Sequence, residues 1–102
     1  MASSTTTSQA PVANWQASGA IACVTLSGRI SADTLGQTWQ DVRDRQMQWL
    51  GQGRENQTLQ INGAAIDYID GAGLAFIIDL QHAQALNGGT TELQGFSATH
   101  QN

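Results

Sequence analysis

The stretch LQINGAAIDYIDGAGLAFII, residues 59–78, contains a strand pattern followed directly by a helix pattern. Polar and apolar residues alternate over residues 57–62, which is typical of a half-buried strand. Residues 63–69 are interpreted as the connection to Asp70, whose carboxylate predicts an N-cap for a helix over residues 71–86. A strand followed by a helix that can pack on it indicates an α/β fold.

The predicted helix over residues 71–86 is apolar on nearly all sides at its start. Residues 74–78 are all apolar, so we expect this end of the helix to be deeply packed. Asn87-Gly88-Gly89 ends the helix, and residues 90–94 then form a last strand. Residues 96–102 begin a third helix, and the sequence stops before that helix has two turns.

Upstream of this stretch, the sequence predicts another helix and two strands. Residues 34–50 carry apolar residues at helical spacing, and Thr34 followed by Gln37 is a capping-box pattern at the start. The residues of this apolar stripe are Leu35, Trp39, Val42 and Trp49. Residues 20–27 predict a strand that forms a hairpin with a shorter one over residues 12–16.

In chain order, the predicted elements are β-β-α-β-α-β. Strand–helix–strand units favour parallel pairing with right-handed crossovers, whereas the hairpin is antiparallel. The sequence therefore predicts an α/β fold with a mixed β-sheet covered by helices. Gly28 marks a bend or bulge in the second strand. The predicted solvated face of the first helix consists of Asp41, Arg43, Asp44 and Arg45.

Composition limits the classes of function. The chain has 102 residues, 40% of them hydrophobic, which fits one domain with a modest core. It contains no lysine, four arginines and a net charge of −4, so it lacks the basic surface of a protein that binds nucleic acid or anionic membranes. Its single cysteine excludes an internal disulfide and fits a reducing compartment. Residues 1–11 are rich in Ser and Thr and are expected to be a disordered leader.

No motif for catalysis or nucleotide binding is complete. Gly71-x-Gly73 is not a dinucleotide fingerprint, because Phe76 stands where the third glycine belongs, and a P-loop needs a lysine. His82 follows Asp79 by three residues on a helix, so the two could form an acid–base pair or part of a metal site. An exposed helical histidine is the simpler interpretation. We therefore expect no enzyme, no cofactor and no metal.

Three further features have a structural and a functional interpretation. Cys23 lies in an apolar strand, which predicts a buried structural thiol. Asp67 and Asp70 flank two residues and could form an acidic pair, although a helix cap and a surface loop residue explain them more simply. Trp15 lies in the first strand, and an exposed tryptophan there would mark an interaction surface.

Three segments taken together resemble STAS domains, the family named after sulphate transporters and anti-sigma factor antagonists. Asp70, Gly73 and Leu74 match the family's Asp-Ser/Thr-x-Gly-Leu pattern at the start of an apolar helix. LSGRISADTLGQTWQDV resembles the family's L-x-G-x-(L/I)-(D/S) segment and the helix after it, and LNGGTTELQGFS resembles its helix-to-strand step. The resemblance covers residues 20–97 and implies a STAS-like fold.

The chain departs from the family at one informative position. Members that are regulated by phosphorylation carry Ser or Thr directly after the aspartate. Here Gly71 follows Asp70, and Ala72 comes next. Neither residue can accept a phosphate, so the sequence excludes a phospho-switch at this site.

The D-x-A-G-L form is similar to the STAS branch attached to phospholipid ABC transporters, the maintenance-of-lipid-asymmetry systems of Gram-negative bacteria. This resemblance implies a regulatory or assembly domain at the cytoplasmic face of the inner membrane that contacts the transporter ATPase or permease. The predicted partner-binding residues are Asp67, Tyr68, Ile69, Asp70, Gly71, Ala72 and Gly73. The alternatives are an anti-sigma factor antagonist that binds a kinase-type anti-sigma factor, and a STAS module that binds a small ligand.

The predicted domain covers residues 12–102. Because the third helix, capped by Ser97, is cut short, the chain is expected to be the N-terminal part of a longer one or a domain without its closing helix. In the second case, one face of the sheet would lose its cover, and an exposed apolar patch there would favour dimers.

Overall fold

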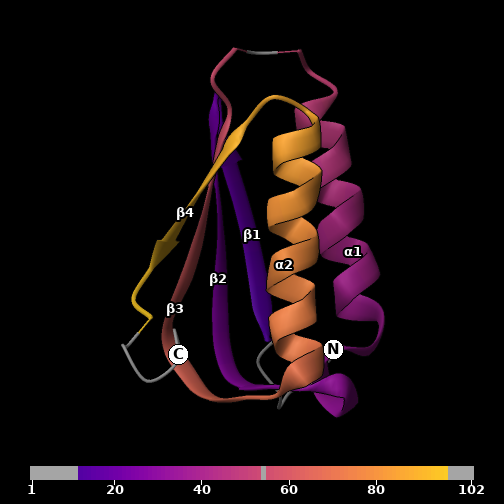
Figure 1. Ribbon diagram of the computed structural model, residues 1–102, viewed down its shortest axis with the longest axis vertical. Helices are drawn as coiled ribbons and strands as arrows, with labels where there is room; N and C mark the ends of the chain where they lie inside the picture. The colour runs from indigo at the N-terminus through magenta and orange to yellow at the C-terminus, as the bar shows by residue number, and fades with distance from the viewer. Residues whose placement is uncertain (1–11, 54, 97–102) are drawn as a thin grey trace, which may run out of the picture.

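The computed structural model describes residues 12–53 and 55–96, which form a four-stranded sheet in the order β1-β2-β3-β4 and two helices. The elements are β1 (Ala13–Ser18), β2 (Ile21–Ile30), α1 (Ala32–Leu50), β3 (Thr58–Ile69), α2 (Gly71–Leu86) and β4 (Thr90–Gln94). β1 pairs antiparallel with β2, whereas the β2–β3 and β3–β4 pairs are parallel. Figure 1 shows both helices on one face of the sheet. The predicted α/β class, mixed sheet and element order are confirmed; the leader over residues 1–11 and residues 97–102 of the predicted third helix lie outside the described residues.

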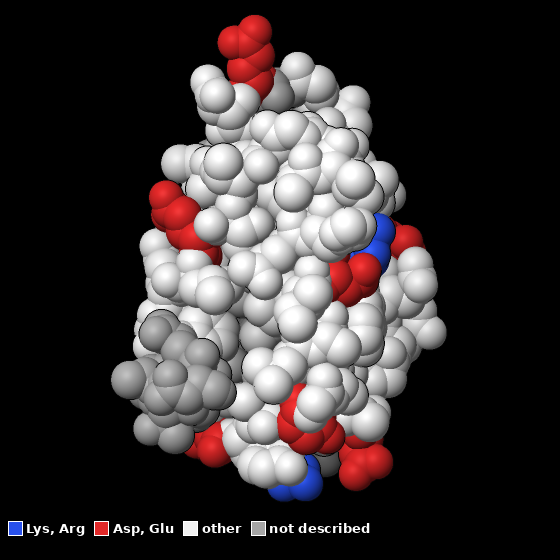
Figure 2. All heavy atoms as spheres, viewed as in Figure 1, with Lys and Arg blue, Asp and Glu red and all other residues white. Residues whose placement is uncertain are grey.

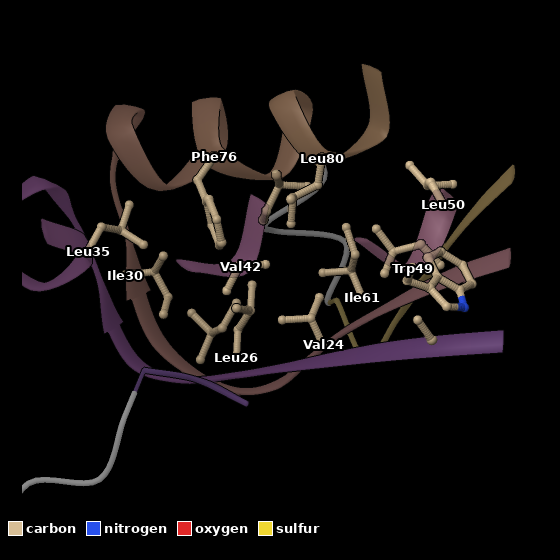
Figure 3. Close-up of a cluster of buried hydrophobic side chains, with 14 residues drawn as sticks. Val24, Leu26, Ile30, Leu35, Val42, Trp49, Leu50, Ile61, Phe76 and Leu80 are labelled. Atoms are coloured by element: carbon tan, nitrogen blue, oxygen red, sulfur yellow. The ribbon is translucent and has the colours of Figure 1, made fainter. Parts of the chain in front are cut away.

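The core lies between the sheet and the two helices. Side chains alternate along β2, so that Val24 and Leu26 are buried on the helix side. Figure 3 shows them pointing toward Phe76, which descends from α2. The other large apolar side chains that are fully buried are Ile30, Leu35, Leu59, Ile61 and Leu80. Burial of this face is what holds the helices on the sheet.

Strand β3 is longer than its sequence pattern predicts. Residues 63–69, interpreted above as a connection, continue the strand to Ile69. They do so because they pair with the second half of β2, up to Ile30 opposite Ile69. The register shifts on the way, and Gly28 has a φ of 74° within this irregular part, which confirms the predicted bulge.

Helix α1 begins earlier than predicted, and its capping residue is a different one. Ser31 is the N-cap, and Thr34 is the third helical residue, where its Oγ1 accepts a hydrogen bond from the Ser31 N–H at 3.0 Å. Gln37 instead reaches Asp41, at 3.4 Å between Nε2 and Oδ1. The predicted Thr34–Gln37 capping box is therefore wrong. Gly36, with a φ of 40°, interrupts the helix just after this first turn, which obscures the true start in the sequence pattern.

Three buried glutamines connect the C-terminal ends of the two helices to the sheet. The Gln46 Nε2 donates to the Leu80 carbonyl at 2.9 Å and to the Gln84 Oε1 at 3.1 Å. The Gln84 Nε2 donates in turn to the Gln57 carbonyl at 3.0 Å, and the Gln57 Nε2 to the Trp49 carbonyl at 2.7 Å. Buried amides need such partners, so this chain of bonds fixes α1, α2 and the start of β3 relative to one another.

The face of the sheet that points away from the helices is polar. The register places four rows of side chains from the strands on it, and the residues are Asn14, Gln16, Ser18, Ile21, Cys23, Thr25, Thr58, Gln60, Asn62, Thr90, Glu92 and Gln94. Ile21 is the only large apolar residue in this set. In this part of the sheet, the described residues form no apolar patch of the kind expected on an uncovered face, because the outward positions carry mainly amides and hydroxyls.

Candidate functional site

The predicted docking segment, residues 67–73, forms a corner at one end of the molecule. Asp67, Tyr68 and Ile69 are the last residues of β3, Asp70 is the N-cap of α2, and residues 71–73 are its first turn. The Asp70 N–H donates to the Ile30 carbonyl at 3.2 Å, so the end of β2 runs beside this corner. The starts of both helices consequently meet the ends of two strands here (Figure 1).

Asp70 holds this corner together. Its Oδ1 accepts a hydrogen bond from the Gly73 N–H at 2.9 Å, which confirms the predicted helix cap. Its Oδ2 also receives the N–H of Ala32, at 3.5 Å, from the first turn of α1. The hydrogen bond from Gly73 holds the pKa of Asp70 below its ordinary value. The carboxylate is thus committed to the backbone, and Asp67 lies exposed on the strand before it.

The two glycines of the first turn have different roles. A Cβ on Gly71 would meet nothing within 4 Å, so this position is open to a partner. A Cβ on Gly73 would lie 2.5 Å from the Ile30 carbonyl oxygen and 2.6 Å from the Ile69 Cγ1. Gly73 is therefore a packing glycine between α2 and two strand ends, and Gly71 alone presents bare backbone to the surface.

One arginine and three carboxylates lie in this corner or beside it. The Arg29 guanidinium lies 4.2 Å from the centre of the Tyr68 ring, which is itself 44% exposed. The register explains the contact, since Arg29 is paired with Tyr68 across the parallel strands. Figure 2 shows carboxylates gathered at this end of the molecule, around a basic group. The charged residues of this end are Arg29, Asp33, Asp67 and Asp70.

The start of α2 is apolar on its outer side as well as its inner side. Phe76 and Ile77 are buried, but Leu74 is 44% exposed and Ile78 is 61% exposed. They lie one turn apart on the same side of the helix. The expectation that the whole start of α2 is deeply packed is wrong, because no described element covers this side. In Figure 2, the middle of this face is largely free of charged side chains.

The hydrogen bonds that Asp79 accepts run to α1, whereas His82 acts on it only through its charge, as one of the groups that lower the pKa of Asp79. The Asp79 Oδ2 accepts hydrogen bonds from the Trp39 Nε1 at 2.8 Å and the Arg43 Nη1 at 2.7 Å, both from α1. Burial raises the pKa of Asp79, but these two bonds and the arginine charge outweigh burial and lower it overall. Arg43 therefore joins the two helices instead of forming part of a solvated face, and His82 is exposed.

Two other sequence interpretations change. Cys23 is half-buried on the polar outer face of the sheet, with its Sγ 3.9 Å from the Thr25 Oγ1, so it is not a core thiol. Trp15 packs edge-on against Trp49, with 5.8 Å between the ring centres, and is half-buried. The sequence left the exposure of Trp15 open, and the structure makes it a packing residue.

The described residues contain no group of three or more His, Cys, Asp or Glu side chains that could hold a metal ion. Neither helix in the described part of the chain combines the length and the apolar character needed to cross a bilayer. What the corner offers chemically is a rigid cap, open backbone at Gly71, and exposed apolar side chains beside carboxylates.

No family model matches the chain, and no curated protein matches it. Solved structures do. A crystal structure of Mglu superimposes with a TM-score of 0.63 over 83% of this chain, at 20% identity, and Mglu in its native form gives 0.59 over 78% at 20% identity. Mglu in an L-glutamate binding form gives 0.57 over 82% of this chain at 16% identity. The chain spans only 20% to 26% of the length of these proteins. At such identity, the likeness shows the fold alone.

Proposed function

We propose that this chain is a non-enzymatic STAS-like domain that docks a partner protein through residues 67–73 and the exposed side of α2. The observation that carries the proposal is the exposure of Leu74 and Ile78 directly beside the Asp70 cap. Exposed apolar side chains next to one another on a rigid element are typical of interaction surfaces. The resemblance to the phospholipid-transporter branch suggests the ATPase or permease of such a transporter as the partner, at the inner face of the inner membrane.

The chemistry of the corner indicates what the partner must offer. Leu74 and Ile78 supply apolar contact area on α2, and the exposed Tyr68 ring and the carboxylates of Asp33 and Asp67 lie at the end of the molecule where this helix begins. A complementary surface has an apolar pocket with basic residues at its rim. Because Asp70 is bonded to backbone N–H groups, the docking surface is preorganised and loses little conformational entropy on binding.

The two positions after Asp70 have no side chain that can accept a phosphate. Gly71 is open enough to receive a side chain, yet it and Ala72 carry no hydroxyl. The proposed role is therefore constitutive: the domain supports assembly or activity of the complex by being bound. A partner would contact the Gly71 backbone directly, at the position where STAS domains that are regulated by phosphorylation carry Ser or Thr.

The test is co-purification with the ATPase and permease of a phospholipid ABC transporter. We expect Ile78→Asp and Gly71→Arg each to reduce binding at least tenfold, roughly the cost of losing one interface contact of 1.4 kcal/mol. Both positions are open, so both variants should keep the wild-type thermal unfolding curve. Leu86→Asp is the matched control, because Leu86 is 73% exposed at the other end of the same helix. Equal binding by all three variants would refute the docking surface.

The anti-sigma alternative would use the same corner with a different partner. Binding of a kinase-type anti-sigma factor, lost in Ile78→Asp and kept in Leu86→Asp, with no binding to the transporter subunits, would favour it. A small-ligand module would instead retain a ligand through purification, which native mass spectrometry of the wild-type chain detects.

A further inference from the structure

Strand β1 is an edge of the sheet that the described residues form. In the described part of the chain, its only neighbouring strand is β2. The Ser27 N–H donates to the Val12 carbonyl at 2.9 Å, and in an antiparallel pair every second residue makes such bonds. The residues between them direct their N–H and C=O groups away from β2, and these residues are Ala13, Trp15 and Ala17.

This edge lacks the features that normally prevent pairing with another strand. The sequence of β1, ANWQAS, contains neither a charge nor a proline. Its register with β2 is unbroken from Ala13 opposite Leu26 to Ser18 opposite Ile21. The other edge, β4, carries Glu92. Charges, prolines and bulges are the usual protection of an edge strand, so β1 is the edge that is open to addition of a strand.

The surface beside this edge carries both signs of charge. A groove of about 670 Å³ lies between β1 and α1. The half-buried Trp15 and the buried Val42 line it, whereas Asp41, Asp44 and Arg45 are exposed along its α1 side. A surface with both signs on one helix can complement a second copy of itself, whereas a surface of one sign would repel it.

We propose that β1 pairs with β1 of a second copy of this chain, antiparallel, about a two-fold axis at Trp15. Ala13 of each copy then lies opposite Ala17 of the other, and the free backbone groups of both strands bond to one another. Small side chains at these two positions leave room for the approach. The pairing joins two four-stranded sheets into one continuous sheet, a size that occurs commonly.

The same two-fold axis brings the α1 helices together in opposite directions. Asp41 and Arg45 lie one turn apart on α1 and both line the groove beside Trp15, so in this arrangement Asp41 of one copy faces Arg45 of the other, and the reverse pair forms by symmetry. This charge complementarity is the reason for assigning the edge to a second copy and not to an extended peptide of another protein. Since α2 contacts β3 and β4, the dimer would leave both docking surfaces accessible.

The test is sedimentation equilibrium of the full chain over a range of concentrations, where we expect a monomer–dimer equilibrium. Ala17→Pro removes an N–H that points away from β2, which an edge strand tolerates, and should abolish the dimer. Ala17→Ser keeps the N–H and is the matched control. Circular dichroism and thermal unfolding establish that both variants are folded.

A charge exchange tests the geometry independently. Arg45→Asp replaces both symmetric attractions by repulsion and should raise the dimer dissociation constant roughly tenfold. Asp41→Arg combined with Arg45→Asp restores the opposite charges and should return the constant close to its wild-type value. A dimer that Arg45→Asp leaves unchanged, or a double variant as weak as the single one, overturns the proposed arrangement.

Two further outcomes overturn the proposal itself. One is a wild-type chain that stays monomeric at all concentrations. The other is a chain that dimerises only after residues 1–11 are removed, because that result assigns the open edge to this segment of the same chain. A dimer that Ile78→Asp abolishes and Ala17→Pro leaves intact would place the contact on α2 and equally contradict pairing through β1.

Discussion

The inner and outer sides of α2 have nearly the same chemistry and opposite surroundings. Phe76 and Leu80 are fully buried against the sheet, whereas Leu74 and Ile78 are about half exposed on the other side. The helix is apolar all round at this end, so its composition does not distinguish a core face from a surface face. What distinguishes them is which side the sheet and α1 occupy. The apolar side chains of this helix that the core does not bury, Leu74 and Ile78, are therefore available for binding.

The same contrast between a packed and an exposed side separates the two glycines in the first turn of α2. Gly73 lies against Ile30 and Ile69 with no room for a methyl group, and Gly71 faces open space two residues earlier. One glycine is needed for packing of the domain, and the other is free to serve an interaction. Substitutions on the two sides should therefore separate stability from binding.

The largest expected effect is on the inner side. Phe76→Ala should lower the free energy of unfolding by about 3–5 kcal/mol, because it leaves a cavity in the core. Ile78→Ala on the outer side should change it by no more than about 0.5 kcal/mol. Urea unfolding followed by circular dichroism measures both values. Similar losses in the two variants would mean that the outer side is packed in the protein, which would break the comparison.

Much of the fold follows from local sequence patterns. The bounds of α2 and β4, the Asp70 cap and the bulge at Gly28 are all confirmed. The second half of β3 was missed because residues 63–69 show no regular alternation and become a strand only by pairing with β2. That pairing partner lies far away in the sequence, so a local pattern cannot reveal it.

The next effect distinguishes the two glycines. Gly73→Ala should destabilise the protein by about 1–3 kcal/mol, since the new methyl group meets the Ile30 backbone, which cannot move aside cheaply. Gly71→Ala should be neutral or stabilising by up to about 1 kcal/mol, because it restricts the unfolded chain and meets nothing. Thermal unfolding of the two variants gives the ranking. A reversed ranking would contradict the assignment of Gly73 to packing and Gly71 to the surface.

The position of the candidate site was predictable from the sequence, but the exposure of its individual residues was not. The sequence indicates a helix start at Asp70 with glycines after it. It does not reveal that Gly73 has no space for a side chain whereas Gly71 has, since this depends on where Ile30 ends its strand. Likewise, the exposure of Leu74 and Ile78 depends on how α2 is rotated on the sheet, and tertiary contacts set that rotation.

A smaller effect concerns the side of α2 that faces α1. Asp79→Ala removes the acceptor of Trp39 and Arg43 and should cost about 1–2 kcal/mol of unfolding free energy, as expected for hydrogen bonds to a partly exposed charge. Asp67→Ala is the control, since Asp67 is an exposed carboxylate on the neighbouring strand, and it should cost no more than about 0.5 kcal/mol. Equal values would show that the bonds of Asp79 add nothing to the contact between the helices.

The smallest effect is the pH dependence of stability. The pKa values of Asp70 and Asp79 are both below their ordinary value of 3.8, because hydrogen bonds favour their charged forms in the folded chain. The unfolded state therefore binds more protons in acid. The stability that these groups contribute is fully present above the unfolded pKa and is lost as the pH falls through the folded values. Melting temperatures of the wild type should decline below about pH 4 for this reason.

Asn at either position removes the titrating group, so Asp70→Asn and Asp79→Asn should each flatten this acid decline, and the double variant should flatten it further. The two sites use different donors at different places on α2, and their contributions should be close to additive. Asp67→Asn serves as the control for removal of an exposed carboxylate near the start of α2. A slope that only Asp67→Asn reduces would show that the acid response comes from exposed carboxylates and not from the two that anchor α2.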